Sequence, residues 1–168
     1  MTKDSRARAS APRHMRLALY QPDIAQNTGT ILRLAACFAT PVDVIGPTGF
    51  DMTDRALRRA GLDYLNHVDL HRHDSYRAFL DSRARASTPG RLVLLTSHAA
   101  TTIYDFAFAP SDTLMLGRES AGVPDDVHAG VDARLKIPIR AGLRSLNLAV
   151  ATGIVLAEAL RQTGGLPR

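Results

Sequence analysis

Short apolar runs alternate with helix-like segments along the chain from residue 16 onward. Most of these runs lack a polar face, which indicates strands in a sheet that is covered on both sides. Strands are predicted at 16–20, 42–46, 92–96, 113–117 and 134–138, with a weaker candidate at 66–71. This alternation of strands and helices predicts an α/β fold, with a mostly parallel sheet covered by helices on both faces.

Helices are predicted between these strands from apolar spacing and from capping residues. In the first helix, one face carries apolar residues at the i, i+3, i+4, i+7 spacing: Ile31, Leu34, Ala35 and Phe38. Helix starts favour side chains that accept backbone hydrogen bonds, and helix ends favour glycine. The expected boundary residues are therefore Asn27, Asp74 and Asn147 at helix starts, and Gly61 and Gly164 at helix ends.

The last predicted helix, 147–163, is apolar on nearly all sides. One stripe contains Leu148, Ala151, Val155 and Ala159, and a second contains Val150, Ile154 and Ala157. A helix with this pattern is buried on two sides. Either one monomer encloses it, or it packs on its own sheet and on a second subunit. We interpret it as the interface of a homodimer.

Length and charge set broad limits on the protein class. The 168 residues suffice for one domain with a substantial core, expected at 16–168 after a basic, disordered tail at 1–15. The net charge of +5 weakly favours a polyanionic partner such as nucleic acid. There is no membrane-length apolar run and no secretory signal, and the single Cys37 excludes an intramolecular disulfide. A cytoplasmic protein is expected.

Familiar nucleotide and metal motifs are missing from the sequence. There is no G-x-G-x-x-G, no G-x-S-x-G and no H-E-x-x-H, and the six histidines show no metal-ligand set. Gly117 and Gly122 have the spacing of a phosphate-binding loop, but Val123 and Pro124 replace its Lys-Ser/Thr. Nucleoside triphosphate binding and metal catalysis are therefore not expected.

Three segments follow strands, where ligands bind in parallel α/β sheets. They are QPDIAQNTGTILR (21–33), GRESAGVP (117–124) and IPIRAGLRSLNLAVAT (137–152). Each has an ordinary structural explanation. Arg33 faces away from the apolar stripe of its helix and can be a solvated surface residue. Glu119 can be a solvated or capping carboxylate in a glycine-rich turn, and Ser145 or Asn147 can be an ordinary helix N-cap. Their occurrence together, in this order, is what favours a functional site.

The three segments together resemble the motifs of the SPOUT superfamily of RNA methyltransferases, in its SpoU/TrmH branch. The similarity rests on NTGTILRLA, LMLGRESAGVP and IPIRAGLRSLNLAVA, and covers roughly residues 16–163. The stretches LALYQPDIAQNTGTILRLA, GPTGF and LRRAGLDYL resemble the TrmL subfamily of tRNA (cytidine/uridine) 2′-O-methyltransferases, which act on the wobble nucleotide. The chain departs from that subfamily at Ala149, Val150 and Ala157.

The resemblance implies a fold, a cofactor and a set of site residues. It implies a deep C-terminal trefoil knot built from segments around 92–97, 113–123 and 135–150. S-adenosylmethionine would bind there, at Leu95, Thr96, Gly117, Ile137, Ser145 and Leu146. Arg33 would act on the ribose 2′-hydroxyl in a dimer-dependent way, in a pocket shaped by Asn27, Glu119, Ser145 and Asn147. The dimer would form through helix 147–163 and the knot region.

A second basic feature suggests where the tRNA anticodon stem-loop binds. Arg55, Arg58 and Arg59 share one helix face, and Tyr64 follows the helix. Cations of this kind position phosphates, and a tyrosine can stack on an unpaired base; a solvated charged face and simple packing are the alternatives.

Two other functions stay open: the same chemistry on ribosomal RNA or another tRNA site, and a noncatalytic RNA-binding module. No role is assigned to Arg118.

Overall fold

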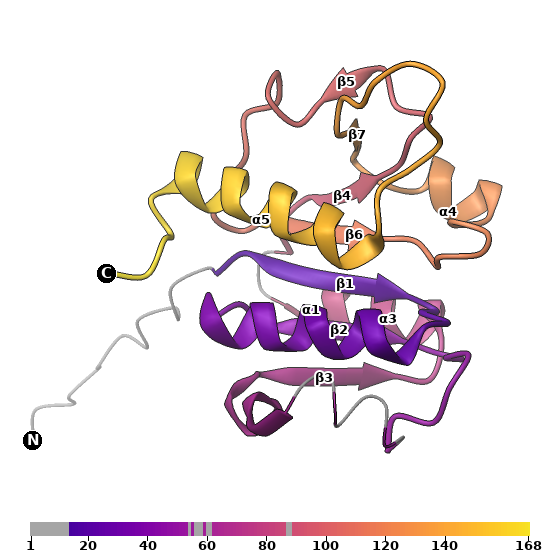
Figure 1. The fold of residues 1–168 in the computed structure, drawn as a ribbon, viewed down its shortest axis with the longest axis vertical. Helices are drawn as coiled ribbons and strands as arrows, with labels where there is room; N and C mark the ends of the chain where they lie inside the picture. Colours follow the sequence, from indigo (N-terminus) through magenta and orange to yellow (C-terminus); the bar gives the residue numbers. More distant parts are fainter. Residues whose placement is uncertain (1–13, 54, 56–58, 60–61, 87–88) are drawn as a thin grey trace, which may run out of the picture.

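The computed structural model describes residues 14–53, 55, 59, 62–86 and 89–168. Within these ranges the strands are β1 (Arg16–Tyr20), β2 (Val42–Ile45), β3 (Leu70–His73), β4 (Leu92–Leu95), β5 (Thr101–Thr102), β6 (Thr113–Leu116) and β7 (Ala133–Lys136). They form one seven-stranded sheet in the order β3-β2-β1-β6-β4-β7-β5, and every neighbouring pair is parallel (Figure 1). The predicted fold class and strands are thus largely confirmed.

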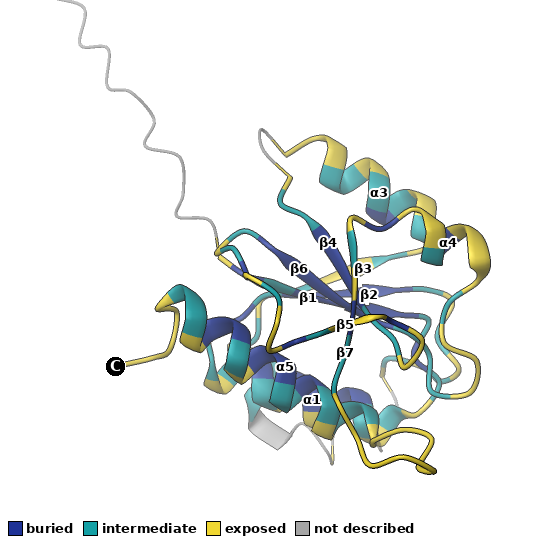
Figure 2. Ribbon diagram, turned by 90° about the horizontal axis from the view of Figure 1, so that it is seen from above, coloured by how far each residue is buried: buried dark blue, intermediate teal, exposed yellow. Residues whose placement is uncertain are grey.

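Helices cover both faces of this sheet. The helices with described bounds are α1 (Ala25–Cys37), the 3₁₀ helix η1 (Leu62–His67), α3 (Tyr76–Ala84), α4 (Asp125–Ala129) and α5 (Leu148–Thr163). Helices α1 and α5 lie on one face, and α3 and α4 lie on the other (Figure 2). In the described part of the chain, no helix is long and apolar enough to cross a membrane.

The central strand β1 shows why the sheet needs two covers. Leu17 and Leu19 point to the face where α1 and α5 pack, and Ala18 and Tyr20 point to the face where Phe79 of α3 packs. These four side chains are all buried. Burying one large apolar side chain stabilises a fold by about 1.5–3 kcal/mol, so both faces contribute a core.

Two of the predicted helix ends are confirmed. The Asn147 side chain accepts hydrogen bonds from the backbone N–H groups of Ala149 and Val150, at 2.9 and 3.3 Å, and so caps α5. Gly164 ends α5 with a φ of 69°, in the left-handed region that glycine adopts without a steric penalty. The predicted stop at Gly61 lies outside the described residues.

Two predicted helix starts are wrong. Helix α3 is capped by Ser75, whose Oγ accepts from the backbone N–H of Ala78 at 3.2 Å, and not by Asp74. Helix α1 begins at Ala25, so Asn27 lies inside its first turn instead of capping it. The physical reason is that the Asn27 amide is engaged by other side chains, described below.

Of the short strands, β3 was predicted at the wrong position and β5 was not predicted. The weak candidate at 66–71 overlaps β3 only at its start, because 62–67 forms η1 and the register with β2 places Leu70 beside Val42. Strand β5 has two residues, which is too short for any apolar alternation to be recognised. It is held by pairing with β7.

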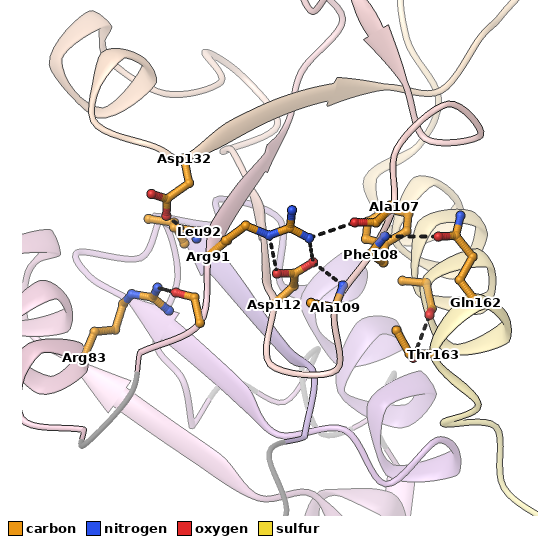
Figure 3. Close-up of polar contacts among 12 residues, drawn as sticks. Arg83, Arg91, Leu92, Ala107, Phe108, Ala109, Asp112, Asp132, Gln162 and Thr163 are labelled. Carbon is orange, nitrogen blue, oxygen red and sulfur yellow. Dashed lines mark hydrogen bonds and ion pairs between the residues drawn. The ribbon is translucent and has the colours of Figure 1, made fainter.

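A buried carboxylate fastens the loop between β5 and β6 to the start of β4 (Figure 3). Asp112 is fully buried and accepts from Arg91 at Nε (2.9 Å) and Nη2 (2.7 Å), and from the backbone N–H of Ala109 at 2.8 Å. In the same loop, the backbone N–H of Phe108 donates to Gln162 of α5 at 3.0 Å. These bonds connect the start of β4, the loop between β5 and β6, and the last helix, α5.

Asp112→Ala is therefore expected to lower the free energy of unfolding by about 3 kcal/mol, because it leaves Arg91 and a backbone donor without their acceptor. Urea denaturation monitored by circular dichroism measures this loss. The control is Asp81→Ala, which removes an exposed i,i+4 pair with Arg77 and should cost less than about 1 kcal/mol. Equal losses for the two variants would contradict the assigned role of Asp112.

Candidate active site

Four loops meet at the carboxyl edge of the sheet. Strands β1, β6, β4 and β7 are consecutive neighbours in the sheet order, so the segments that follow them lie side by side. Ligand sites in parallel α/β proteins form at this edge. The loops after these strands, together with the start of α5, line a cleft.

The cleft has two lobes. One, the apolar lobe, is a cavity of about 510 Å³ lined mainly by Leu95, Leu116, Ile137, Leu146, Leu148 and Ala151. The other, the polar lobe, is a cavity of about 830 Å³ whose lining includes Asn27, His98, Arg118, Glu119, His128 and Asn147. The lobes are continuous, because both are lined by Leu95, Thr96, Ser97, Ser145, Leu146 and Leu148.

The residues predicted to hold a cofactor all face this cleft. Leu95, Thr96, Ser145 and Leu146 line both lobes, Ile137 lines the apolar lobe, and Gly117 lines the polar lobe. They come from three loops far apart in the sequence. The parallel strand order brings them together.

A directed chain of hydrogen bonds crosses the polar lobe. It begins at the backbone N–H groups of α5 that donate to Asn147 Oδ1. Asn147 Nδ2 donates to Asn27 Oδ1 at 3.0 Å, and Asn27 Nδ2 donates to Glu119 Oε1 at 3.2 Å. The other carboxyl oxygen, Oε2, accepts from the backbone N–H of Asp23 at 3.0 Å.

The direction of this chain fixes how each amide is turned. An amide side chain has one accepting and one donating end. The backbone N–H groups of α5 fix Asn147 with its oxygen toward the helix, so its nitrogen must donate to Asn27. Asn27 in turn must present its own nitrogen to Glu119. The network thus joins α1, the 117–124 loop and the start of α5 into one wall of the cleft.

Asp23 is a site residue that the sequence analysis missed. Its carboxylate accepts from the backbone N–H of Glu119 at 3.2 Å and from the Ser120 hydroxyl, and it lies 3.4 Å from Nε of Arg118. A hydrogen bond from the Glu119 carboxyl group, helped by Ser120 and Arg118, lowers the pKa of Asp23 to about 2. Burial, together with the neighbouring Asp23, raises the pKa of Glu119. Asp23 therefore loses its proton at a lower pH than Glu119 does.

The glycines of GRESAGVP serve the loop itself. A Cβ at residue 117 would lie 2.7 and 2.8 Å from the carbonyl carbon and Cα of Gly122. Arg118 and Gly122 exchange two backbone hydrogen bonds, of 3.0 and 2.9 Å, which draw the two ends of the loop together. Gly122 has a φ of 65°, which disfavours a side chain there. The tight turn thus places Arg118 and Glu119 beside Asp23.

Arg33 is not among the residues that line the cleft. It lies six residues beyond Asn27 on α1, about 9 Å along the helix axis, and its side chain is exposed. Its guanidinium carbon is 4.8 Å from the centre of the Tyr64 ring. A single chain therefore does not bring Arg33 together with Glu119, Ser145 and Asn147.

The predicted RNA-binding residues lie away from the cleft. Arg55 and Arg59 are exposed, and Arg58 lies outside the described residues. Tyr64, half-buried on η1, packs beneath Arg33. No signal in the sequence linked Tyr64 with Arg33, because a contact between two separate helices leaves no local pattern.

Comparison with known proteins places this site in a family. The model of the SpoU rRNA Methylase family matches residues 14–157, which include all of the cleft loops. The chain belongs to the SpoU rRNA Methylase family. Membership of this family agrees with the observed seven-stranded parallel sheet and its two helical layers.

Similar proteins match about nine-tenths of the chain. A protein of Beijerinckia indica named tRNA (cytidine(34)-2'-O)-methyltransferase is 56% identical over 153 residues, covering 90% of this chain and 94% of the relative. A protein of the same name from Escherichia coli is 38% identical over 152 residues, covering 89% and 94%.

Solved structures extend this comparison. One described as "Structural insights into the 2-OH methylation of C/U34 on tRNA" is 43% identical, with a TM-score of 0.84, and the match covers 90% of this chain and 97% of that one. The SpoU methyltransferase AviRb of Streptomyces viridochromogenes, in complex with the cofactor AdoMet, is 27% identical with a TM-score of 0.83. That match covers 92% of this chain and 59% of AviRb.

Proposed function

We propose that this protein transfers a methyl group from S-adenosylmethionine to the ribose 2′-hydroxyl of nucleotide 34, the wobble nucleotide of tRNA, which is a cytidine or a modified uridine. The observation that carries the proposal is the 56% identity to a relative named for this reaction, across 90% of this chain and 94% of the relative. Every loop that lines the cleft lies inside the family match at 14–157.

The apolar lobe fits an adenosyl group. Its leucines and Ile137 offer an apolar slot, and Thr96, Ser97 and Ser145 place hydroxyl groups along it. The bound cofactor supplies a methyl group already activated on a sulfonium. We propose that the loops at 92–97, 113–123 and 135–150 form a trefoil knot around it, a rare exception to unthreaded chains. The lining of both lobes by residues 95–97, 145, 146 and 148 supports this arrangement.

Arg33 is the proposed catalytic residue, acting on the substrate hydroxyl. A guanidinium group keeps its proton in proteins, so Arg33 cannot accept the hydroxyl proton as a base. It instead orients the hydroxyl and stabilises negative charge that develops on its oxygen. Since Arg33 does not line the cleft of its own chain, we propose that it completes the cleft of a second copy.

The exposed apolar surface around the cleft supports a homodimer. Large side chains remain exposed at Ile24, Ile139, Leu143, Leu146 and Val150, with Leu143 67% exposed and Val150 52% exposed. These residues lie near the starts of α1 and α5 and in the loop between β7 and α5. A soluble monomer rarely exposes a cluster of this kind. A second copy packed along α5 and the knot region covers it.

The tRNA backbone is proposed to lie along the exposed cations Arg55 and Arg59. Phosphate contacts of this kind fix the position of the anticodon stem-loop without reading its sequence. Arg58, which lies outside the described residues, completes the proposed set by sequence alone. Removing any one such contact should reduce the salt dependence of tRNA binding by about one charge.

The coverage of the matched structures favours tRNA as the substrate. The match to the C/U34 structure covers 97% of that chain, whereas the matches to the SpoU methyltransferase AviRb and to a Sinorhizobium meliloti rRNA methyltransferase cover 60% and 57% of theirs. The C/U34 structure is therefore matched over nearly its whole length, and the other two only in part. A noncatalytic RNA-binding module is disfavoured by the retained cleft and its Asn147–Asn27–Glu119 network.

Mass spectrometry of tRNA nucleosides tests this proposal. Cells without the gene should lose 2′-O-methylation at nucleotide 34, and the purified protein with S-adenosylmethionine should restore it. Unchanged 2′-O-methylation at nucleotide 34 in cells without the gene would contradict the proposal. Titration calorimetry separates the alternatives, because a noncatalytic module predicts no binding of S-adenosylmethionine, whereas either RNA substrate predicts binding.

A further inference from the structure

On the outward face of α1, Arg33 lies over an aromatic ring from a neighbouring element, that of Tyr64 in η1. The guanidinium carbon lies 4.8 Å from the centre of the Tyr64 ring, within the roughly 6 Å at which a cation is attracted to the face of an aromatic ring. The two residues come from different elements, α1 and η1. Their contact is therefore set by the fold and not by local sequence.

The Tyr64 ring is more enclosed than the Arg33 side chain. Tyr64 is half-buried, and its neighbours Leu65 and Val68 pack against the core. Arg33 is exposed and has several rotatable bonds, which carry a large conformational entropy in solution. A half-buried ring beside the guanidinium restricts this freedom before any substrate binds.

We propose that Tyr64 is a positioning residue that holds the Arg33 guanidinium extended from α1, ready to enter the cleft of a second copy. This inference rests on the proposed function, since it needs Arg33 to act on the ribose hydroxyl. It differs from the expectation that Tyr64 stacks on an RNA base, because here Arg33 lies over one face of the ring. Preorganisation lowers the cost of placing a catalytic group.

The test measures kcat and KM for tRNA methylation by full-length variants, and compares each constant with its wild-type value. Tyr64→Leu should lower kcat by about 3- to 30-fold, the loss of one cation–ring contact. The KM for tRNA and the dissociation constant for S-adenosylmethionine should stay within about twofold. Tyr64→Phe keeps the ring and should restore kcat to near the wild-type value. The matched control is Tyr104→Leu, which removes a tyrosine that is 58% exposed in a different loop.

The outcomes separate this inference from the function on which it rests. A raised KM for tRNA with unchanged kcat would mean that the ring contacts RNA, and would overturn the inference. Equal losses in the Phe and Leu variants would also overturn it, by assigning the effect to the hydroxyl. In an Arg33→Ala background, Tyr64→Leu should add nothing further. If Arg33→Ala itself is fully active, the proposed role of Arg33 fails, whatever Tyr64 does.

If Tyr64→Leu unfolds, its thermal transition shows this directly, and Tyr64→Trp then carries the test. Tryptophan offers the strongest cation–ring attraction. A folded tryptophan variant should keep kcat near the wild-type value, and a loss of kcat above threefold would contradict the inference.

Discussion

Replacing Arg33 with alanine is expected to lower the rate of tRNA methylation by at least about 100-fold, the usual cost of removing one group that stabilises charge in a transition state. S-adenosylmethionine should bind with nearly unchanged affinity, because Arg33 is not among the residues that line either lobe of the cleft. Single-turnover assays with labelled cofactor measure the first effect, and calorimetry measures the second.

The control for this result is Arg77→Ala. Arg77 lies on α3, its side chain is 84% exposed, and α3 covers the sheet face opposite α1. Its loss should leave the rate within about twofold. Arg33→Lys keeps the charge but not the planar donor geometry, and should recover only part of the rate. An Arg33→Ala variant that retains normal turnover would exclude the proposed catalytic role.

Asn27→Asp is expected to damage the cleft in a pH-dependent way. The substitution removes the Nδ2 donor to Glu119 and places a third carboxyl group beside Glu119 and Asp23. Like charges in one site raise the pKa of at least one of them. At pH 8 the variant should bind S-adenosylmethionine about 10- to 100-fold more weakly than the wild type, the usual cost of an unsatisfied polar group.

The sign of the pH effect follows from that raised pKa. A carboxyl whose pKa is higher in the folded than in the unfolded protein stabilises the fold below its ordinary pKa of about 4, and this contribution is lost as pH rises through the raised value. The variant should therefore approach the wild type near pH 5 and fall behind it toward pH 8. Affinity and melting temperature measured across this range provide the check.

Asn66→Asp makes the same charge change at an exposed position of η1, and serves as the matched control. It should show no more than a small, salt-screened effect at any pH. A loss in Asn27→Asp that is the same at pH 5 and pH 8 would show that the hydrogen-bond direction through Asn27 is not what matters.

A mixture of the two variant chains tests the shared site. In a mixed dimer, an Arg33→Ala chain offers an intact Asn27 network, and an Asn27→Asp chain offers an intact Arg33. If Arg33 completes the cleft of its partner, mixing the two impaired proteins at pH 8 and limiting S-adenosylmethionine should restore up to about a quarter of the wild-type rate. This fraction follows if half of the dimers are mixed and each mixed dimer has one complete site. No recovery in verified mixed dimers would place Arg33 and Asn27 in the same chain's site.

Local patterns predicted the elements, whereas the site depends on contacts between distant residues. Largely apolar runs marked β1, β2, β4 and β6, because buried parallel strands have no wet face. The start of α1 was wrong because Asn27 bonds to Glu119 and Asn147, 92 and 120 positions away. No local pattern contains such partners.

The same reasoning explains the residues that were missed. Asp23 is three positions beyond β1 and looks like an ordinary loop aspartate until the fold places it beside Glu119. Resemblance to a family placed the predicted cofactor residues on loops that line the cleft, because short motifs carry positional information. It did not show that Arg33 lies outside its own cleft, since that is a property of the three-dimensional packing.

The place of β1 within the sheet has a consequence for synthesis on the ribosome. The first strand made is a central one, and its partner β6 follows almost a hundred residues later. Until then one edge of β1 stays open, and exposed strand edges invite pairing with other chains. The Asn147 end of the network emerges later still. A chain that ends before β6 therefore carries an open strand edge and no complete cleft.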